Sequence, residues 1–217
     1  MRNVRYVSGA ALVCALLAPV VVIVGSALAA AAQPSGYDPV RETLSTLASL
    51  GATDRWIMTS TLVVSGLAYI VVAAGLTGAS TSARIVLAIA GASVAMAGMF
   101  PQPVGGSSVW HMGSATVGWI AFTMWPLLVC PRPPEPGLLS RRSTWLVTGV
   151  LLGLLGWFFI QLQSDGVLLG LTERILVVSQ TLWPAVVVLA FRLRPSRAPI
   201  GLEPLGRVAT EPPREVA

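Results

Sequence analysis

Long apolar runs separated by short polar stretches dominate this chain of 217 residues. A membrane-spanning helix needs about 20 mainly apolar residues, because the hydrocarbon layer of a bilayer is about 30 Å thick. Six stretches approach or exceed that length, at about residues 7–32, 56–77, 84–100, 109–130, 144–160 and 174–191. The pattern predicts an all-α, polytopic membrane protein folded as a bundle of six transmembrane helices.

The first apolar stretch also has features of a secretory signal peptide. Arg2 and Arg5 precede it, and alanines close it near Ala32. The apolar part of a signal peptide is usually about 7–15 residues long, and this stretch is about twice as long. We therefore expect a retained membrane anchor, whereas cleavage would leave five spans.

The distribution of arginine around the six stretches predicts the orientation. Eleven arginines fall on one side: Arg2, Arg5, Arg84, Arg132, Arg141, Arg142, Arg192, Arg194, Arg197, Arg207 and Arg214. Three fall on the other: Arg41, Arg55 and Arg174. Because basic residues concentrate in cytoplasmic loops, both termini are predicted to be cytoplasmic in a plasma-membrane protein.

Composition agrees with lipid as the solvent. Hydrophobic residues make up 54% of the chain and charged residues 11%, against roughly 25% charged residues in a soluble domain. The formal net charge of +5 is explained by the arginines beside the spans, so we expect no nucleic-acid partner. The chain has no Lys, which excludes a Schiff-base or P-loop lysine, and we expect no cofactor. Residues 1–192 form the predicted transmembrane domain, and the proline-rich residues 193–217 are predicted to be a disordered tail.

The first outer loop contains the signals of a short surface helix. Asp38 suits a helix N-cap, and Pro39 suits the first helical position. Val40, Leu44 and Leu47 then recur at helical spacing. We expect an amphipathic helix over about residues 39–50 on the outer side.

The predicted orientation places most of the notable polar residues on the outer face. Candidates for catalysis are His111, Asp38, Glu42 and Ser45, with Ser114 as a further serine. Candidates for ligand binding are Arg41, Asp54, Arg55, Gln102, Asp165, Glu173 and Arg174. The last three are expected in or beside the third outer loop, so that the span interiors carry essentially no charge.

The residue types available can be compared with the needs of metal binding, nucleophilic catalysis and coupled transport. Zinc sites need three or four ligands, and one His without an outer Cys is a poor supply, so no metal is predicted. Ser45 or Ser114 with His111 and Asp38 provides the residue types of nucleophilic catalysis, although no nucleophile-elbow pattern accompanies them. Uncharged span interiors disfavour proton- or ion-coupled transport.

Two further patterns bear on packing. Gly91 with Ala95, and Gly149 with Gly153, have the four-residue spacing of close helix contacts. Tryptophans fall near the ends of the predicted spans, as in an interfacial aromatic belt; they are Trp56, Trp110, Trp125, Trp145 and Trp183.

The chain resembles a family of bacterial six-span membrane proteins catalogued as domain of unknown function 998. The resemblance is carried by residues 37–47 (YDPVRETLSTL) and by Gly98 to Pro101 followed by His111. It is more distantly similar to the Frag1/DRAM-type membrane proteins. The resemblance implies the six-span fold and topology but no activity. An acidic residue usual in such families near the position of Gln102 is missing here, which argues against a metal or acid–base site.

Three functional hypotheses follow from the sequence. The leading one is a non-enzymatic membrane protein that engages membrane lipid or a partner through its outer polar face. The second is an outer-leaflet hydrolase or transferase acting on lipid headgroups. The third is a structural accessory subunit that packs against another membrane protein.

Overall fold

The computed structural model describes residues 6–129 and 137–193, and its regular elements there are all helical. The α-helices are α1 (Gly9–Ala31), α2 (Leu44–Leu47), α3 (Trp56–Gly75), α4 (Thr81–Met99), α5 (Val109–Met124), α6 (Arg141–Gln163) and α7 (Leu169–Arg192). A 3-10 helix, η1 (Trp125–Leu128), continues α5. The all-α fold class is confirmed, whereas the predicted tail lies almost wholly outside the described residues.

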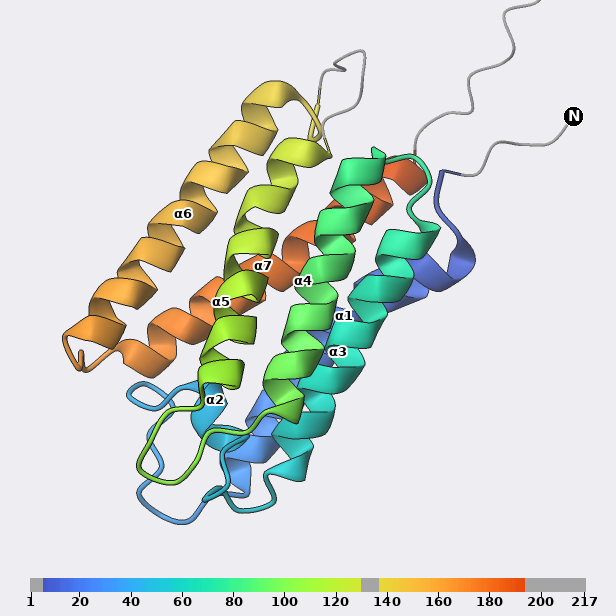
Figure 1. Cartoon of the computed structure of the whole chain (residues 1–217). Helices are drawn as coiled ribbons and strands as arrows, with labels where there is room; N and C mark the ends of the chain where they lie inside the picture. The colour runs from blue at the N-terminus through green and yellow to red at the C-terminus, as the bar shows by residue number, and fades with distance from the viewer. Residues whose placement is uncertain (1–5, 130–136, 194–217) are drawn as a thin grey trace, which may run out of the picture.

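The long helices run side by side, and their connections gather at two ends of the bundle (Figure 1). One end holds α2 and the loops at residues 32–43, 48–55, 100–108 and 164–168, and we call it the α2 end. The start of α1, the turn between α3 and α4, and the end of α7 lie at the other end. The loops predicted to share one face therefore meet.

Within residues 6–129 and 137–193, five helices are long and apolar enough to cross a membrane: α1, α3, α4, α6 and α7. Helix α5 has 16 residues, and the 4-residue η1 follows it directly. Each apolar stretch seen in the sequence coincides with a helix, although α6 and α7 begin before residues 144 and 174. The chain is a multi-pass membrane protein by length and composition of these helices.

Serine residues are the N-caps of several of these helices, and each serine side chain accepts a hydrogen bond from a free first-turn amide. Ser8, Ser80, Ser108 and Ser140 cap α1, α4, α5 and α6 in this way. The largest buried side chains include Trp125 and Tyr69, and the Tyr69 ring contacts the Phe122 ring edge to face. The N-terminal ends of these four helices are thus satisfied locally, and aromatic side chains pack in the interior beside alanine, valine and leucine.

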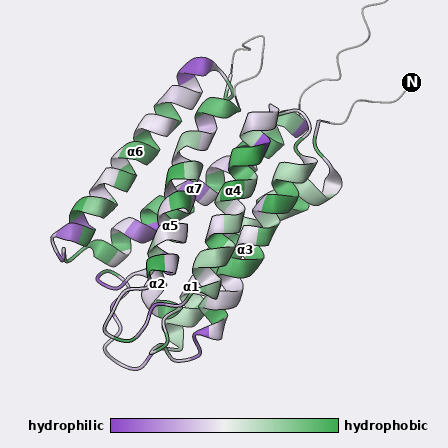
Figure 2. Cartoon of the chain, viewed as in Figure 1, coloured by the Kyte–Doolittle hydropathy of each residue, from purple (hydrophilic) through white to green (hydrophobic). Residues whose placement is uncertain are grey.

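Apolar side chains also cover much of the outside of the bundle. Figure 2 shows hydrophobic residues along the helices and most hydrophilic ones toward the ends and loops. Trp56, Trp110 and Trp145 are exposed near helix ends, as an interfacial belt requires. The belt prediction is wrong for Trp125, which is fully buried and donates its indole N–H to the Ala83 carbonyl at 2.8 Å.

Small residues allow close packing of α3 against α4. A Cβ atom on Gly91 would lie 2.5 Å from the Gly66 carbonyl oxygen, so the two backbones are in direct contact. Gly149 and Gly153 on α6 have no atom within 4 Å of such a Cβ among the described residues. The packing prediction is therefore confirmed for Gly91 and wrong for the pair on α6.

The predicted outer helix over residues 39–50 is reduced to the four residues of α2. Asp38 does not cap it, because its carboxylate accepts the Val40 amide at 2.8 Å within a turn. Thr43 is the N-cap instead, with its side chain accepting from the Thr46 amide. The carbonyls of Pro39 and Glu42 accept hydrogen bonds from Arg174, and this tertiary contact competes with a longer helix.

Candidate functional site

Two leucines anchor α2 in the α2 end of the bundle. Leu44 and Leu47 lie three residues apart and therefore on one helical face, and both are buried in a cluster with Ala29, Ala48 and Met58. The buried face holds α2 against α1, α3 and α7. Ser45, between the two leucines, is thereby fixed in position relative to α5.

His111 lies in the first turn of α5 and is 1% exposed. Its Nδ1 atom lies 2.9 Å from the Ala97 carbonyl oxygen and 3.0 Å from that of Phe100. These carbonyls belong to the C-terminal end of α4, where helix carbonyls lack partners within the helix. The Nε2 atom lies 3.0 Å from the Ser45 hydroxyl oxygen.

These contacts define the roles of the two ring nitrogens. A carbonyl oxygen only accepts, so the hydrogen between Nδ1 and the α4 carbonyls belongs to Nδ1. In the neutral imidazole Nε2 then carries the lone pair, and the Ser45 hydroxyl donates to it. The tautomer is inferred from this network. The arrangement orients the histidine as a proton acceptor toward a serine.

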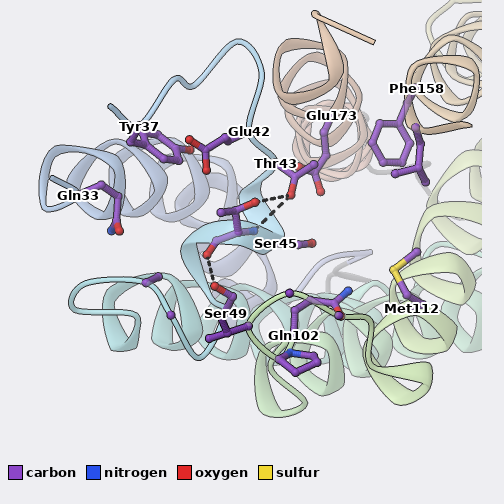
Figure 3. A pocket seen from close by; sticks show the side chains of 18 of the residues that line it. Gln33, Tyr37, Glu42, Thr43, Ser45, Ser49, Gln102, Met112, Phe158 and Glu173 are labelled. Atoms are coloured by element: carbon purple, nitrogen blue, oxygen red, sulfur yellow. Dashed lines mark hydrogen bonds between the residues drawn. The ribbon is translucent and has the colours of Figure 1, made fainter. Parts of the chain in front are cut away.

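An open cleft of about 510 Å³ lies beside this pair at the α2 end. Its lining includes polar residues of the loops, among them Gln33, Thr43, Ser45 and Gln102, and Figure 3 shows several of them around α2. The opposite wall is apolar and comes from α5 and α6; it consists of Met112, Trp119, Phe158 and Leu162. The cleft thus has one polar and one apolar wall.

A smaller cavity of about 70 Å³ lies inside the bundle next to the cleft. Its lining is mainly apolar and includes His111. Ser45, Trp119 and Glu173 line both spaces. The hydroxyl of Ser45 is therefore at the boundary between the open cleft and the interior of the bundle.

Glu173 occupies a different place from the one expected. The outer loop was predicted to contain it, but α7 begins at Leu169 and makes Glu173 a helical residue that is 3% exposed. Its carboxylate accepts a hydrogen bond from the Leu44 amide, directly before Ser45. Glu173 therefore belongs to the first turns of α7, at the α2 end of the bundle, and not to the preceding loop.

Arg174 fastens the loop before α2 to α7. Its guanidinium donates to the carbonyls of Pro39 and Glu42, each at 2.7 Å, and to the Tyr37 hydroxyl. Burial of Tyr37 raises the pKa of its phenol, while the neighbouring Arg174 charge opposes that shift. All these partners belong to the protein, so Arg174 acts here as a structural clamp.

The other candidates share the α2 end without joining Ser45 and His111. Gln102 lines the cleft, and its side-chain oxygen accepts from the Ser108 amide at 2.6 Å. Asp38 forms an exposed ion pair with Arg41 at 3.5 Å, and Glu42 lines the cleft and accepts from the Asp38 amide. Six charged candidates are not among the cleft-lining residues: Asp38, Arg41, Asp54, Arg55, Asp165 and Arg174. The guanidinium of Arg55 lies 3.9 Å from the centre of the Trp56 ring.

Sequence reasoning missed the polar residues inside the bundle. Gln180 is buried and donates to the Trp119 carbonyl at 3.0 Å and to the Thr123 hydroxyl at 2.9 Å. It also lines the inner cavity. The available signal was a single Gln side chain within an apolar run. An amide without a hydrogen-bond partner is costly in hydrocarbon, so such a Gln indicates a partner inside the bundle. In the described parts of the chain, no three His, Cys, Asp or Glu side chains gather as a metal site would require.

The family model of a protein of unknown function, DUF998, matches residues 12–190. The chain belongs to the DUF998 family. That match covers both halves of the site, since Ser45 and His111 lie within it. No curated protein and no solved structure shows a detectable similarity to the chain. Because this family has no known function, membership in it assigns no activity to the chain.

Proposed function

We propose that this DUF998 protein binds a membrane lipid at the extracytoplasmic end of a six-span bundle. The observation that carries the proposal is the cleft of about 510 Å³ with one polar and one apolar wall. A lipid headgroup fits the hydrogen-bonding side of the loops, and its chain fits the apolar side. Met112 and Leu162 provide that apolar surface at the end of the bundle where a chain can reach the bilayer.

The sixth span of the proposal is α5 together with η1. At about 1.5 Å per α-helical residue and 2.0 Å per 3-10 residue, the two helices extend roughly 32 Å. This length is comparable with a hydrocarbon layer of about 30 Å. The excess of arginine beyond the opposite ends of the spans supports a cytoplasmic location for both termini. The cleft then faces outward.

The lipid proposal can be tested on the apolar wall. We expect full-length protein purified in mild detergent to retain a phospholipid that lipid mass spectrometry detects. Met112→Glu places a charge on the cleft wall and is expected to reduce retention at least tenfold, because burying an unpaired charge is costly. Val109→Glu is the matched control, since Val109 is on the same helix, 83% exposed and outside the cleft lining.

Equal retention in the two variants, or no retained lipid in the wild type, contradicts the proposal. Stoichiometric co-purification of one membrane protein in place of lipid would instead favour the accessory-subunit hypothesis.

Arg41→Ala tests whether Arg41 contributes to binding of the lipid headgroup. The Arg41 side chain is exposed beside Asp38, and a loss of anionic lipid in this variant would assign it to phosphate binding.

A further inference from the structure

We propose that Ser45 is a nucleophile, activated by His111, for acyl transfer from the carboxylic ester of a lipid. The inference rests on the proposed lipid binding and specifies the chemistry of the same cleft. It is carried by the 3.0 Å contact between the Ser45 hydroxyl and His111 Nε2 at the boundary between cleft and inner cavity. A serine hydroxyl is a weak nucleophile until an adjacent base accepts its proton.

The histidine is oriented for this task by the end of α4. In a Ser–His–Asp triad a carboxylate holds the Nδ1 hydrogen, so that Nε2 faces the serine as a base. Here the carbonyls of Ala97 and Phe100 take the place of that carboxylate. They are held by the helix backbone, so the tautomer and ring orientation are set before any substrate arrives. The neutral carbonyls provide less stabilisation of an imidazolium than a carboxylate does.

Ser45 differs from neighbouring serines in its hydrogen bonding. The hydroxyls of Ser49 and Ser114 donate to carbonyls of Thr46 and Trp110, three or four residues before them. Such bonds return a polar group to its own chain segment. The Ser45 hydroxyl instead contacts a ring nitrogen 66 residues away in the sequence. This pairing is the feature that assigns reactivity to Ser45 among these three serines.

Glu173 acts as a positioning residue in this proposal. Its buried carboxylate accepts the Leu44 amide, one residue before the nucleophile, and it also lines the cleft. The apolar side of the cleft, with Met112 and Phe158, is available for the acyl chain next to Ser45. The ester carbonyl of a lipid placed this way lies at the boundary where Ser45 is located.

The proposed reaction balances without a metal or redox partner. The Ser45 oxygen forms a bond to the ester carbonyl carbon, and its proton moves to His111 Nε2. The ester C–O bond then breaks, and the departing alcohol oxygen takes that proton, which leaves an acyl-serine. Water, or a hydroxyl group of a second lipid, gives its proton to Nε2 and attacks the acyl carbon. The bond between that carbon and the Ser45 oxygen then breaks, and the serine oxygen takes the proton back from Nε2. The products are a carboxylic acid or a new ester, and Ser45 and His111 are regenerated.

A fluorophosphonate probe tests the nucleophile directly. Full-length protein in mild detergent is treated with the probe, and the modified residue is mapped by peptide mass spectrometry. We expect one adduct per chain, located on Ser45. Ser45→Ala should abolish the adduct, and the matched variant Ser114→Ala should retain it. His111→Gln should slow labelling at least 100-fold, because the proton acceptor is lost.

An adduct elsewhere, or no adduct on Ser45 in the folded wild type, overturns the nucleophile. Mapping the adduct in the wild type keeps the test independent of whether Ser45→Ala folds. A purely structural hydrogen bond would lower the melting temperature of His111→Gln and leave the wild type unlabelled. Lipid retention by Met112→Glu and Val109→Glu is scored separately. Retained lipid with unlabelled Ser45 defeats acyl transfer alone, and labelled Ser45 without retained lipid defeats the lipid-binding proposal.

Discussion

Two adjacent side chains of α7, Glu173 and Arg174, bind the backbone of the loop before α2 and of the first residue of α2. Glu173 accepts the Leu44 amide, whereas Arg174 donates to the carbonyls of Pro39 and Glu42. The Arg174 guanidinium is charged, and hydrogen bonds from a charged donor are roughly twice as strong as neutral ones. The position of the loop before α2 therefore depends on these two residues of α7 as well as on the buried leucines of α2.

Replacing Arg174 with Ala should destabilise the protein. The change removes the donor from the carbonyls of Pro39 and Glu42 and from the Tyr37 hydroxyl, and we expect a loss of about 2–4 kcal/mol. Denaturant titration in detergent measures this free energy of unfolding. Arg41→Ala is the control, because its ion pair with Asp38 is exposed and such pairs contribute about 0–1 kcal/mol. Equal losses in the two variants would contradict the clamp.

Glu173 can be tested by a pair of substitutions. Glu173→Gln keeps an oxygen that can accept the Leu44 amide, whereas Glu173→Leu leaves that buried amide without a partner. An unsatisfied buried donor costs about 1–3 kcal/mol, so Leu should destabilise more than Gln by about that amount. Hydrogen exchange at the Leu44 amide should accelerate in the Leu variant. An unchanged exchange rate would remove Glu173 from its positioning role.

At the scale of elements, the close approach of the loop to α7 requires a glycine. A Cβ atom at position 170 would collide with the carbonyl oxygens of Glu42 and Pro39. The backbone bond from the Leu171 amide to the Val40 carbonyl, at 3.0 Å, lies at the same contact. The loop before α2 and the first turn of α7 thus form one packed unit.

Gly170→Ala should push the loop before α2 away from the first turn of α7. The added methyl group displaces the loop backbone, and overpacking of this kind costs about 1–3 kcal/mol of unfolding free energy. The displacement should also slow fluorophosphonate labelling of Ser45. Gly149→Ala is the matched control on α6, where no described atom lies within 4 Å of the new Cβ, so stability should be unchanged or slightly higher. A stable Gly170→Ala with unaltered labelling would show that the contact is unimportant.

The same unit explains what the sequence could and could not predict. Apolar runs determine where the long helices lie, since burial in lipid depends on length and composition alone. The helix signal at Asp38 and Pro39 was local, and it failed because Arg174 takes carbonyls that a helix would use. Pairing of Ser45 with His111 depends on how α2 packs beside α5, and no local pattern encodes that packing.

At the scale of the whole molecule, the two ends of the bundle differ in chemistry. The α2 end contains the cleft, the buried Glu173 and the Ser45–His111 pair. The opposite end contains most of the arginines that adjoin helices in the described chain, namely Arg84, Arg141, Arg142 and Arg192. Orientation in the membrane therefore decides which leaflet could supply a ligand to the cleft.

Cysteine labelling in intact cells can determine this orientation. In a background with Cys14→Ala and Cys130→Ala, a single cysteine is introduced by Ser107→Cys at the α2 end or by Thr81→Cys at the other end; both positions are exposed. A membrane-impermeant maleimide should label the first in intact cells, because positive charge keeps the arginine-rich end inside. The second should be labelled only after lysis.

The reversed result would place the cleft in the cytoplasm and contradict the outer-leaflet part of the lipid proposal, while the contact of Ser45 with His111 would be unaffected. Labelling therefore separates the orientation of the bundle from the chemistry of its site. Extracytoplasmic labelling of Ser107→Cys, together with the fluorophosphonate adduct on Ser45, would place a reactive serine where the cleft meets the outer leaflet. The arginine distribution and the site geometry are independent observations, and both would then indicate that the functional surface is the extracytoplasmic one.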